Sequence, residues 1–184
     1  MLLAVQDLEK ESLHFDTSFA CGQIEYGDGI EQQGPMVAEG QADVVEEYRG
    51  PRDTVSDIRV RARYSGQVIQ PCARCLEPVA YPVAGDFDLI FRPIKAEAEG
   101  GEHSLGDSET EIGYYENDGL LLEDVLREQV LLSLPAKSLC REDCHGLCSN
   151  CGHNLNSGQC SCESAPADPR WTALSDLRSR IKSE

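Results

Sequence analysis

Two features that many proteins carry are missing from this sequence: an apolar run long enough to cross a membrane, and a convincing secretory leader. The first residues form a short apolar start, Met1 to Val5, and acidic residues follow at once. A leader needs a positively charged start and a longer apolar core, and a membrane helix needs about 20 apolar residues. We therefore expect a soluble, cytoplasmic protein with no membrane partner.

Positive charge is also scarce. The 16 Lys and Arg residues face 33 Asp and Glu residues, which gives a formal net charge of −17. The acids gather in two blocks, because residues 1–48 and residues 97–136 each hold 11 acidic residues and one basic residue. A field of this sign repels a polyanion over about 8–10 Å at physiological salt, so broad nucleic-acid binding is disfavoured. Any RNA contact has to be local.

Nothing in the acidic run from Ala96 to Glu111 predicts catalysis. The run has no nucleophile beside it, and no neighbouring residue would give two of its carboxylates the different pKa values that a general acid and a general base need. Its six carboxylates and few apolar residues are typical of a flexible loop. We expect no catalytic role for this run and no small-molecule substrate.

One basic island interrupts the acidity. In it the apolar side chains of Ile58, Val60, Ala62 and Tyr64 alternate with those of Arg59, Arg61 and Arg63. Alternation of this kind is typical of a strand with one buried face. The arginines either pair with the acidic blocks or form a contact surface for phosphate or for a partner protein. Further candidate contacts are Arg74, Arg178 and Arg180.

Cysteine, by contrast, is abundant, with nine residues in the chain. In Cys148-Ser-Asn-Cys151-Gly152, two thiolates three residues apart can bind one ion, and the glycine permits the tight turn. Cys72-Ala-Arg-Cys75 is a second pair far upstream. Tetrahedral sulfur sites are commonly built from two short pairs of this kind, so eight cysteines are enough for two zinc sites.

The spacing predicts one zinc site within the tail and a second that ties the tail to the body. The first would use Cys148, Cys151, Cys160 and Cys162, and the second Cys72, Cys75, Cys140 and Cys144. This division follows proximity in the chain, and a mixed division of the eight thiolates stays open. Cys21 is left over.

Two other uses of the cysteines compete with zinc. Cys144-x3-Cys148-x2-Cys151 has the spacing of the iron-sulfur loop in radical enzymes that use S-adenosylmethionine. That loop normally opens a large barrel, and the chain after Cys151 is too short for one. A redox role for Cys72-Ala-Arg-Cys75 also stays open, although the pair lacks the strand-then-helix context of a thioredoxin motif.

The remaining patterns predict strands and two helices. Residues 13–19, 35–49, 79–83 and 86–91 have strand character, with the last two as neighbouring antiparallel strands and the Cys72 pair in a turn between strands. A helix is expected from Asp118, as its cap, to about Leu132, with Leu122, Val125, Leu126 and Val130 packed on the sheet. A final helix should begin at Asp168-Pro169.

Together these elements predict an α+β fold. We expect a mainly antiparallel sheet or partly open barrel covered by one helix, followed by a cysteine-rich zinc-binding tail and a final short helix. The division falls between a β body at residues 1–136, which includes the acidic loop and the packing helix, and a tail at residues 137–184. The body is long enough to bury a core.

Several of these motifs in combination resemble the YceD family, the large ribosomal RNA subunit accumulation proteins. The resemblance runs from about residue 55 to the end and is carried by Cys72-x2-Cys75-Leu, the acidic loop, Leu120 through Leu134-Pro135, the run Cys140 to Asn156, Cys160-Ser-Cys162 and Asp168-Pro-Arg170. It implies a bacterial cytoplasmic factor for the accumulation of large-subunit ribosomal RNA, with no established enzymatic activity. Its partner would be the large-subunit precursor or its RNA, reached directly or through another protein. The competing hypothesis is a redox or iron-sulfur protein.

Overall fold

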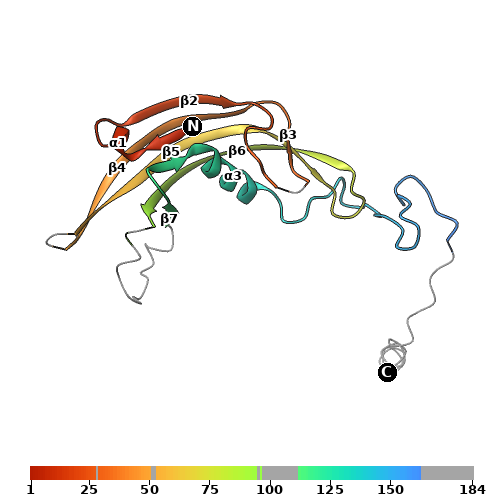
Figure 1. The fold of residues 1–184 in the computed structure, drawn as a ribbon. Helices are drawn as coiled ribbons and strands as arrows, with labels where there is room; N and C mark the ends of the chain where they lie inside the picture. The colour runs from red at the N-terminus through yellow and green to blue at the C-terminus, as the bar shows by residue number, and fades with distance from the viewer. Residues whose placement is uncertain (28, 51–52, 95, 97–111, 163–184) are drawn as a thin grey trace, which may run out of the picture. The chain divides into compact units, whose positions relative to one another are not determined.

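The computed structural model describes residues 1–162 apart from 28, 51–52, 95 and 97–111 (Figure 1). The chain divides into two compact units, one made of Met1–Ala73 and Glu77–Cys140, the other of Arg74–Leu76 and the chain from Arg141 onward. The division after residue 136 that the sequence suggests stays a prediction. No helix within the described ranges is long and apolar enough to cross a membrane.

A six-stranded sheet dominates the first unit. Its strands follow the order β2-β4-β5-β6-β7, and the short β3 pairs with β5. Their bounds are Leu13–Phe19 for β2, Glu31–Gln32 for β3, Met36–Gly50 for β4, Asp53–Pro71 for β5, Pro78–Pro93 for β6 and Ile112–Tyr115 for β7. All neighbours are antiparallel except β6 and β7, which run parallel. Of the two expected forms, a mainly antiparallel sheet or a partly open barrel, the structure has the mainly antiparallel sheet.

The β5 strand follows the predicted alternation. On β5, Ile58, Val60, Ala62 and Tyr64 are buried, whereas the arginines between them are partly or fully exposed. Residues 79–83 and 86–91 were expected as two strands, which is wrong, because both belong to the continuous β6 and pair with β5. The turn between β5 and β6 does hold the Cys72 pair, as predicted, and the Cys72 N–H donates to the Glu77 carbonyl at 2.8 Å.

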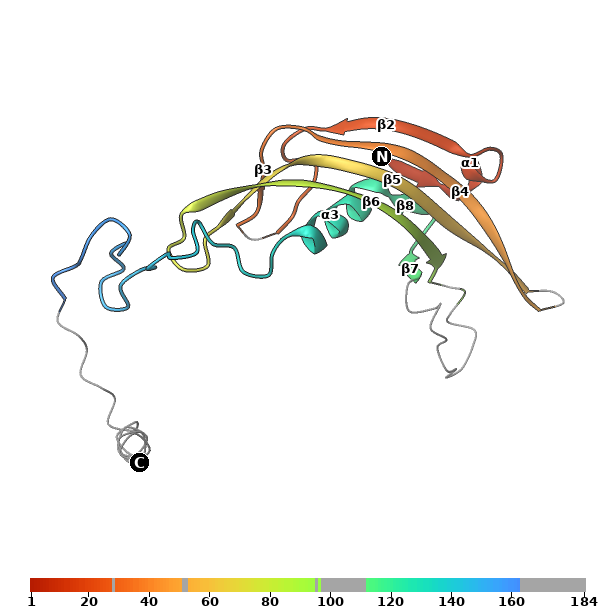
Figure 2. The same cartoon turned by 180° about the vertical axis from the view of Figure 1, so that it is seen from behind.

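One helix covers the buried face of the sheet. Figures 1 and 2 show α3, Leu122–Ser133, on the inner side of the curved strands. Its buried residues are the four predicted ones, Leu122, Val125, Leu126 and Val130. The Tyr64 hydroxyl donates to the Gln129 carbonyl at 3.1 Å and so fastens β5 to the helix.

The predicted start of this helix is wrong. Asp118 was expected to cap it, but the helix begins four residues later, after Leu121. The reason is strand pairing, since Gly119–Leu121 form β8 and pair with β1, Leu2–Ala4, in a small two-stranded sheet. A four-residue helix, α1 at Val5–Leu8, follows β1. The residues predicted to form the acidic loop beyond Ala96 and the final helix from Asp168 lie outside the described part of the chain.

A buried ion pair lies where β5 meets β6. The Arg92 guanidinium donates to both carboxylate oxygens of Asp57, with its Nε at 3.1 Å and its Nη2 at 2.8 Å, and both residues are almost fully buried. Glu47, which is about half exposed, forms a second ion pair with Arg92. No sequence pattern predicted this cluster, because Arg92 and Asp57 are simply polar residues within strands. The positive charge of Arg92 and the negative charge of Asp57 neutralise each other, whereas either charge alone would be costly to bury.

We expect Arg92→Met to lower the free energy of unfolding by about 3–5 kcal/mol, because the buried Asp57 carboxylate loses the guanidinium that donates two hydrogen bonds to it. The double variant Arg92→Met with Asp57→Leu should recover most of that loss, since Glu47 can turn to solvent. Urea unfolding followed by circular dichroism measures both. A single-variant cost below about 1 kcal/mol, the range of exposed pairs, would contradict the buried-pair interpretation.

Candidate metal centres

Eight of the nine cysteines gather into two groups of four. Within each group all the Sγ atoms lie within 4.8 Å of one another. Four thiolates around a tetrahedral ion with metal–sulfur bonds of about 2.3 Å are separated by roughly 3.8 Å, so each group is close to the size of one site. We name them cluster A, formed by Cys72, Cys75, Cys140 and Cys144, and cluster B, formed by Cys148, Cys151, Cys160 and Cys162. The spacing predicted the same two sets.

Cluster B is built on a tight turn. The Gly152 N–H donates to the Cys148 carbonyl at 2.9 Å, and the Cys148 N–H donates to the His153 carbonyl at 2.8 Å. Gly152 has a φ of +72°, a conformation that glycine adopts without steric cost. This is the role that the sequence predicted for the glycine after the second cysteine. The turn directs two sulfurs to one point, as a chelating pair requires.

The thiols of cluster B influence one another strongly. The backbone N–H groups of Cys151 and Asn150 stabilise the Cys148 thiolate and lower its pKa to about 6. Hydrogen bonding to Cys151 and the nearby Cys160 sulfur raise the pKa of Cys162 to about 12. The Cys162 thiol therefore keeps its proton at neutral pH when no cation is bound, although a metal ligand must be a thiolate. A divalent ion removes that conflict and favours the fully deprotonated set.

The Cys72-Cys75 turn has a related conformation without the glycine. Leu76, the residue after the second cysteine, has a φ of +62° and its side chain is 64% exposed. A leucine in the left-handed region costs roughly 1–2 kcal/mol. Sequence reasoning missed this feature, although the parallel between Leu76 and Gly152 could have revealed it. Backbone held in so uncommon a conformation is typical of a functional turn.

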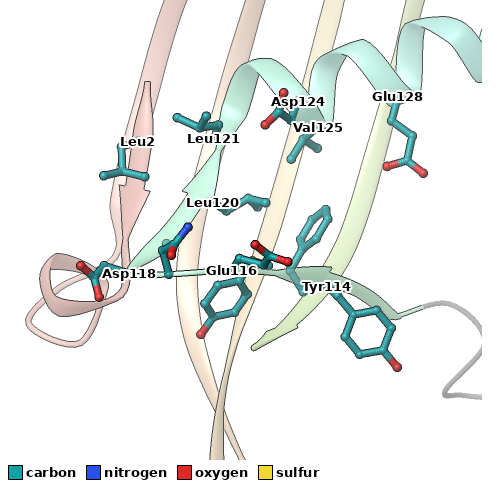
Figure 3. Close-up of a pocket in the computed structure, with 13 residues that line it drawn as sticks. Leu2, Tyr114, Glu116, Asp118, Leu120, Leu121, Asp124, Val125 and Glu128 are labelled. Carbon is teal, nitrogen blue, oxygen red and sulfur yellow. The ribbon is translucent and has the colours of Figure 1, made fainter. Parts of the chain in front are cut away.

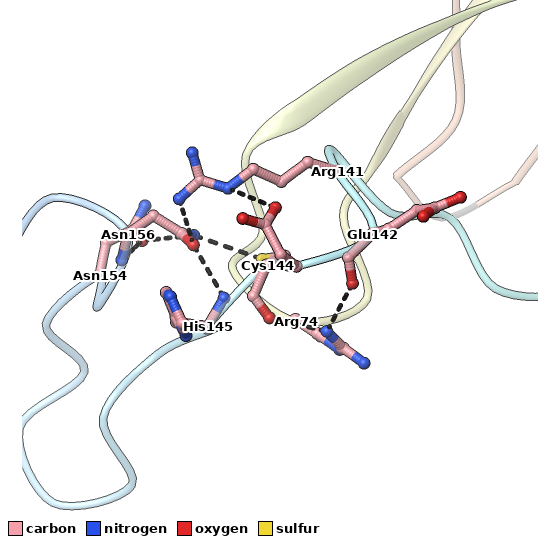
Figure 4. Close-up of polar contacts among 8 residues, drawn as sticks. Arg74, Arg141, Glu142, Cys144, His145, Asn154 and Asn156 are labelled. Carbon is pink, nitrogen blue, oxygen red and sulfur yellow. Dashed lines mark hydrogen bonds and ion pairs between the residues drawn. The ribbon is translucent and has the colours of Figure 1, made fainter.

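Asn156 organises the loop around Cys144, as Figure 4 shows. Its Nδ2 donates to the Cys144 sulfur at 3.3 Å, and its Oδ1 accepts from the His145 N–H at 2.8 Å and from Arg141 at 2.7 Å. A hydrogen bond to a coordinating sulfur stabilises its thiolate form and fixes its direction. The sequence analysis did not single out Asn156, although it ends the motif that carries the family resemblance.

Arg74 lies on the other side of the same loop. Its guanidinium donates to the carbonyls of Glu142 at 3.2 Å and Cys144 at 2.7 Å, and the Arg74 carbonyl accepts from the Leu147 N–H at 3.1 Å. Gly146 is required here, because a Cβ at that position would lie 3.1 Å from the Arg74 carbonyl oxygen and its φ is +78°. These bonds hold the cysteine loop, and the contact of Arg74 with RNA or a partner stays a prediction.

The two clusters differ in burial. Three of the four cysteines in cluster A are buried, whereas those of cluster B are half-buried or exposed. Burial protects bound metal from water and from competing ligands. Cluster B is therefore the more accessible of the two to a chelator.

Replacing Cys148 by Ser should remove one metal equivalent and spare the other, because Cys148 belongs to cluster B alone. The measurement is elemental analysis of the purified protein. Cys21→Ser is the matched control and should keep the full metal content, because Cys21 lies in neither group. Loss of all metal from the Cys148 variant would contradict two separate sites.

Asn156→Ala should weaken metal binding at cluster A by about 10–100-fold, the usual effect of removing a hydrogen bond to a metal ligand. Competition with a chromophoric chelator measures the affinity. Gln159→Ala changes an exposed amide in the same loop and should leave the affinity unaltered. Equal affinities of both variants and the original protein would show that the Asn156 contact has no influence on the metal.

The arginines of β5 form a ladder of ion pairs with the neighbouring strands. Arg59 pairs with Asp88 at 2.6 Å, Arg61 with Asp43 at 2.8 Å and Arg63 with Glu39 at 2.6 Å. Hydrogen bonds between the first pair lower the pKa of Asp88 and raise that of Arg59. The sequence left open pairing or external contact, and these distances favour pairing. A role in contact stays a prediction, as it does for Arg178 and Arg180, which lie outside the described residues.

The grouping of the sulfurs also bears on the iron-sulfur alternative. A radical-enzyme loop uses all three cysteines of Cys144-x3-Cys148-x2-Cys151 on one cluster. Here Cys144 belongs to cluster A, whereas Cys148 and Cys151 belong to cluster B. The grouping of the sulfurs therefore does not favour one cluster held by these three cysteines.

The fold and the site define a class of protein: a partly open β-sheet body with two four-cysteine clusters that could hold metal ions. The family model described as "Large ribosomal RNA subunit accumulation protein YceD" matches residues 60–178. This chain belongs to the YceD family.

Curated relatives occur in mycobacteria. An uncharacterized protein of Mycobacterium tuberculosis (strain ATCC 25618 / H37Rv) is 32% identical over 127 residues, which cover 68% of this chain and 58% of the relative. An uncharacterized protein of Mycobacterium leprae (strain TN) is 28% identical over 124 residues, 66% of this chain and 53% of the relative. The chain thus spans just over half the length of these relatives. No solved structure matches the chain.

Proposed function

We propose that this protein is a non-enzymatic ribosome-biogenesis factor that supports the accumulation of large-subunit ribosomal RNA in the cytoplasm. The observation that carries the proposal is the family match, which extends from the arginine strand through both cysteine clusters. The family's description names the large ribosomal RNA subunit, and its partner here would be the large-subunit precursor or its RNA. The clusters would stabilise the surface through which the protein acts.

Zinc is the metal that suits the clusters best. Sets of four cysteines in two short pairs are typical of structural zinc sites, in which all four positions are filled by the protein. Such a site supplies stability to a loop-rich segment that has few apolar residues. In this role Cys72, Cys75, Cys140 and Cys144 would hold one ion, and Cys148, Cys151, Cys160 and Cys162 the other.

A protein-mediated route to the precursor fits the charges better than direct RNA binding. The net charge of −17 opposes approach to a polyanion. The arginines of the β5 ladder already have carboxylate partners within 2.8 Å, and RNA would have to displace them. Direct contact through Arg59, Arg61 and Arg63 is therefore the less favoured route.

The alternative is a redox or iron-sulfur protein. The division of the sulfurs into two closed groups of four supports structural sites over a catalytic one, since a catalytic metal keeps an open position. A purified sample should be colourless and contain about two zinc ions per chain, with cysteine thiolates as ligands. Visible absorbance from iron would favour the alternative.

The proposal predicts that depleting the protein in its host lowers large-subunit ribosomal RNA relative to small-subunit RNA. Complementation with the original sequence should restore the ratio. Complementation with the pair Cys148→Ser and Cys151→Ser should fail, because cluster B would lose half of its ligands. Quantifying the two ribosomal RNAs after gel separation measures the outcome.

Two further variants make the test specific. Cys21→Ser removes the cysteine outside both groups and should complement fully. The triple variant Arg59→Gln, Arg61→Gln and Arg63→Gln should also complement and co-sediment with large-subunit precursors if contact is mediated by protein. An unchanged RNA ratio after depletion would overturn the proposed function. If only the arginine variant failed to complement, the result would favour direct RNA contact through these arginines.

A further inference from the structure

A groove of about 470 Å³ opens on the first unit beside α3. Its walls are the end of β7, the β7–β8 turn, β8, the start of α3 and Leu2 of β1 (Figure 3). Among the described residues, its lining includes no cysteine of either cluster and no arginine of the β5 ladder.

The walls of the groove carry exposed apolar side chains. Leu2 is 55% exposed, Leu121 46% and Tyr114 45%. Leu2 and Leu121 are also partners in the β1–β8 register, so they form one continuous apolar strip. Apolar side chains gathered along a concave surface mark an interaction site far better than scattered ones do.

The same groove carries four exposed carboxylates. Glu116 and Asp118 come from the β7–β8 turn, and Asp124 and Glu128 from α3. Figure 3 shows Glu128 extending from the helix toward the side on which Glu116 and Tyr114 lie. No basic side chain is among the described residues that line the groove. Among the described residues, none of the four carboxylates forms an ion pair, in contrast to the acids that pair with the β5 arginines.

The combination of an apolar strip with unpaired carboxylates defines the chemistry of a ligand. A nucleic acid or another anion would be repelled, and a purely apolar ligand would leave the carboxylates without partners. We propose that the groove binds a lysine- and arginine-bearing peptide segment with apolar side chains, such as the tail of a basic partner protein. Its apolar side chains would cover Leu2, Leu121 and Tyr114, and its cations would pair with the carboxylates at the rim.

This inference deepens the proposed function and rests on it, because the ribosomal role determines where the protein would encounter such a partner. Peptide binding by the purified protein is nevertheless independent of any ribosomal role, so the two can fail separately. One segment of the chain itself also has the required chemistry, because residues 170–182 carry three arginines and one lysine. The acidic residues 97–111 do not, since they hold six carboxylates and no Lys or Arg.

The test is titration of the full chain into a fluorescent synthetic peptide of alternating lysine and leucine pairs, followed by anisotropy at low salt. The triple variant Glu116→Gln, Asp124→Asn and Glu128→Gln should weaken binding roughly tenfold, the combined effect of three exposed ion pairs. The matched control Glu11→Gln, Asp16→Asn and Asp86→Asn removes the same charge from exposed sites outside the groove and should retain binding. If both triple variants weakened peptide binding equally, the effect would come from net charge alone, and the proposal would be overturned.

A second pair of variants tests the apolar strip. Leu121→Ser should weaken binding several-fold, whereas Leu132→Ser, at a 72% exposed position outside the groove, should not. Circular dichroism confirms that each variant is folded. No binding of the peptide by the original protein would overturn the proposal. So would tighter binding after Arg178→Gln, Arg180→Gln and Lys182→Gln, because it would identify this chain's own terminal segment as the occupant.

Discussion

The register of β4, β5 and β6 is the constraint on which the first unit depends. Side chains alternate along a strand, so a shift of one residue would turn Arg59, Arg61 and Arg63 into the core and Val60 and Tyr64 out of it. The observed register avoids this and also brings each arginine within reach of a carboxylate on a neighbouring strand. Ion pairs of this exposure contribute little stability. Their larger effect is to favour one pairing of the strands over its alternatives.

The second unit is held together by different means. Among its described residues only Cys75, Cys144 and Gly146 are buried, so no apolar core is available to fix the loops. Backbone hydrogen bonds, the Asn156 side chain and the closely spaced sulfurs take its place. A segment of this kind is too small to bury much apolar surface, and a bound metal is the usual substitute. Its described residues accordingly include six cysteines and no valine or isoleucine.

Much of the fold followed from local patterns, and the errors have identifiable causes. The alternation around Arg61 predicted both faces of β5, and the spacing of the cysteines predicted the two sulfur groups. The start of α3 was misplaced because pairing between β8 and β1, far apart in the chain, outweighed the capping preference of Asp118. The Arg92–Asp57 pair was missed because burial of a charge depends on packing that no local pattern encodes. Asn156 was missed because an amide near a cysteine has no distinctive spacing.

The connection between β1 and β8 has a consequence for the order of folding. β4, β5 and β6 follow one another through short turns, so their contacts can form early and locally. Leu3, by contrast, pairs with Leu120, and closing so long a loop is slow. During synthesis the amino terminus must therefore wait until β8 has emerged. The apolar strip that Leu2 completes would then exist only in molecules whose body has finished folding.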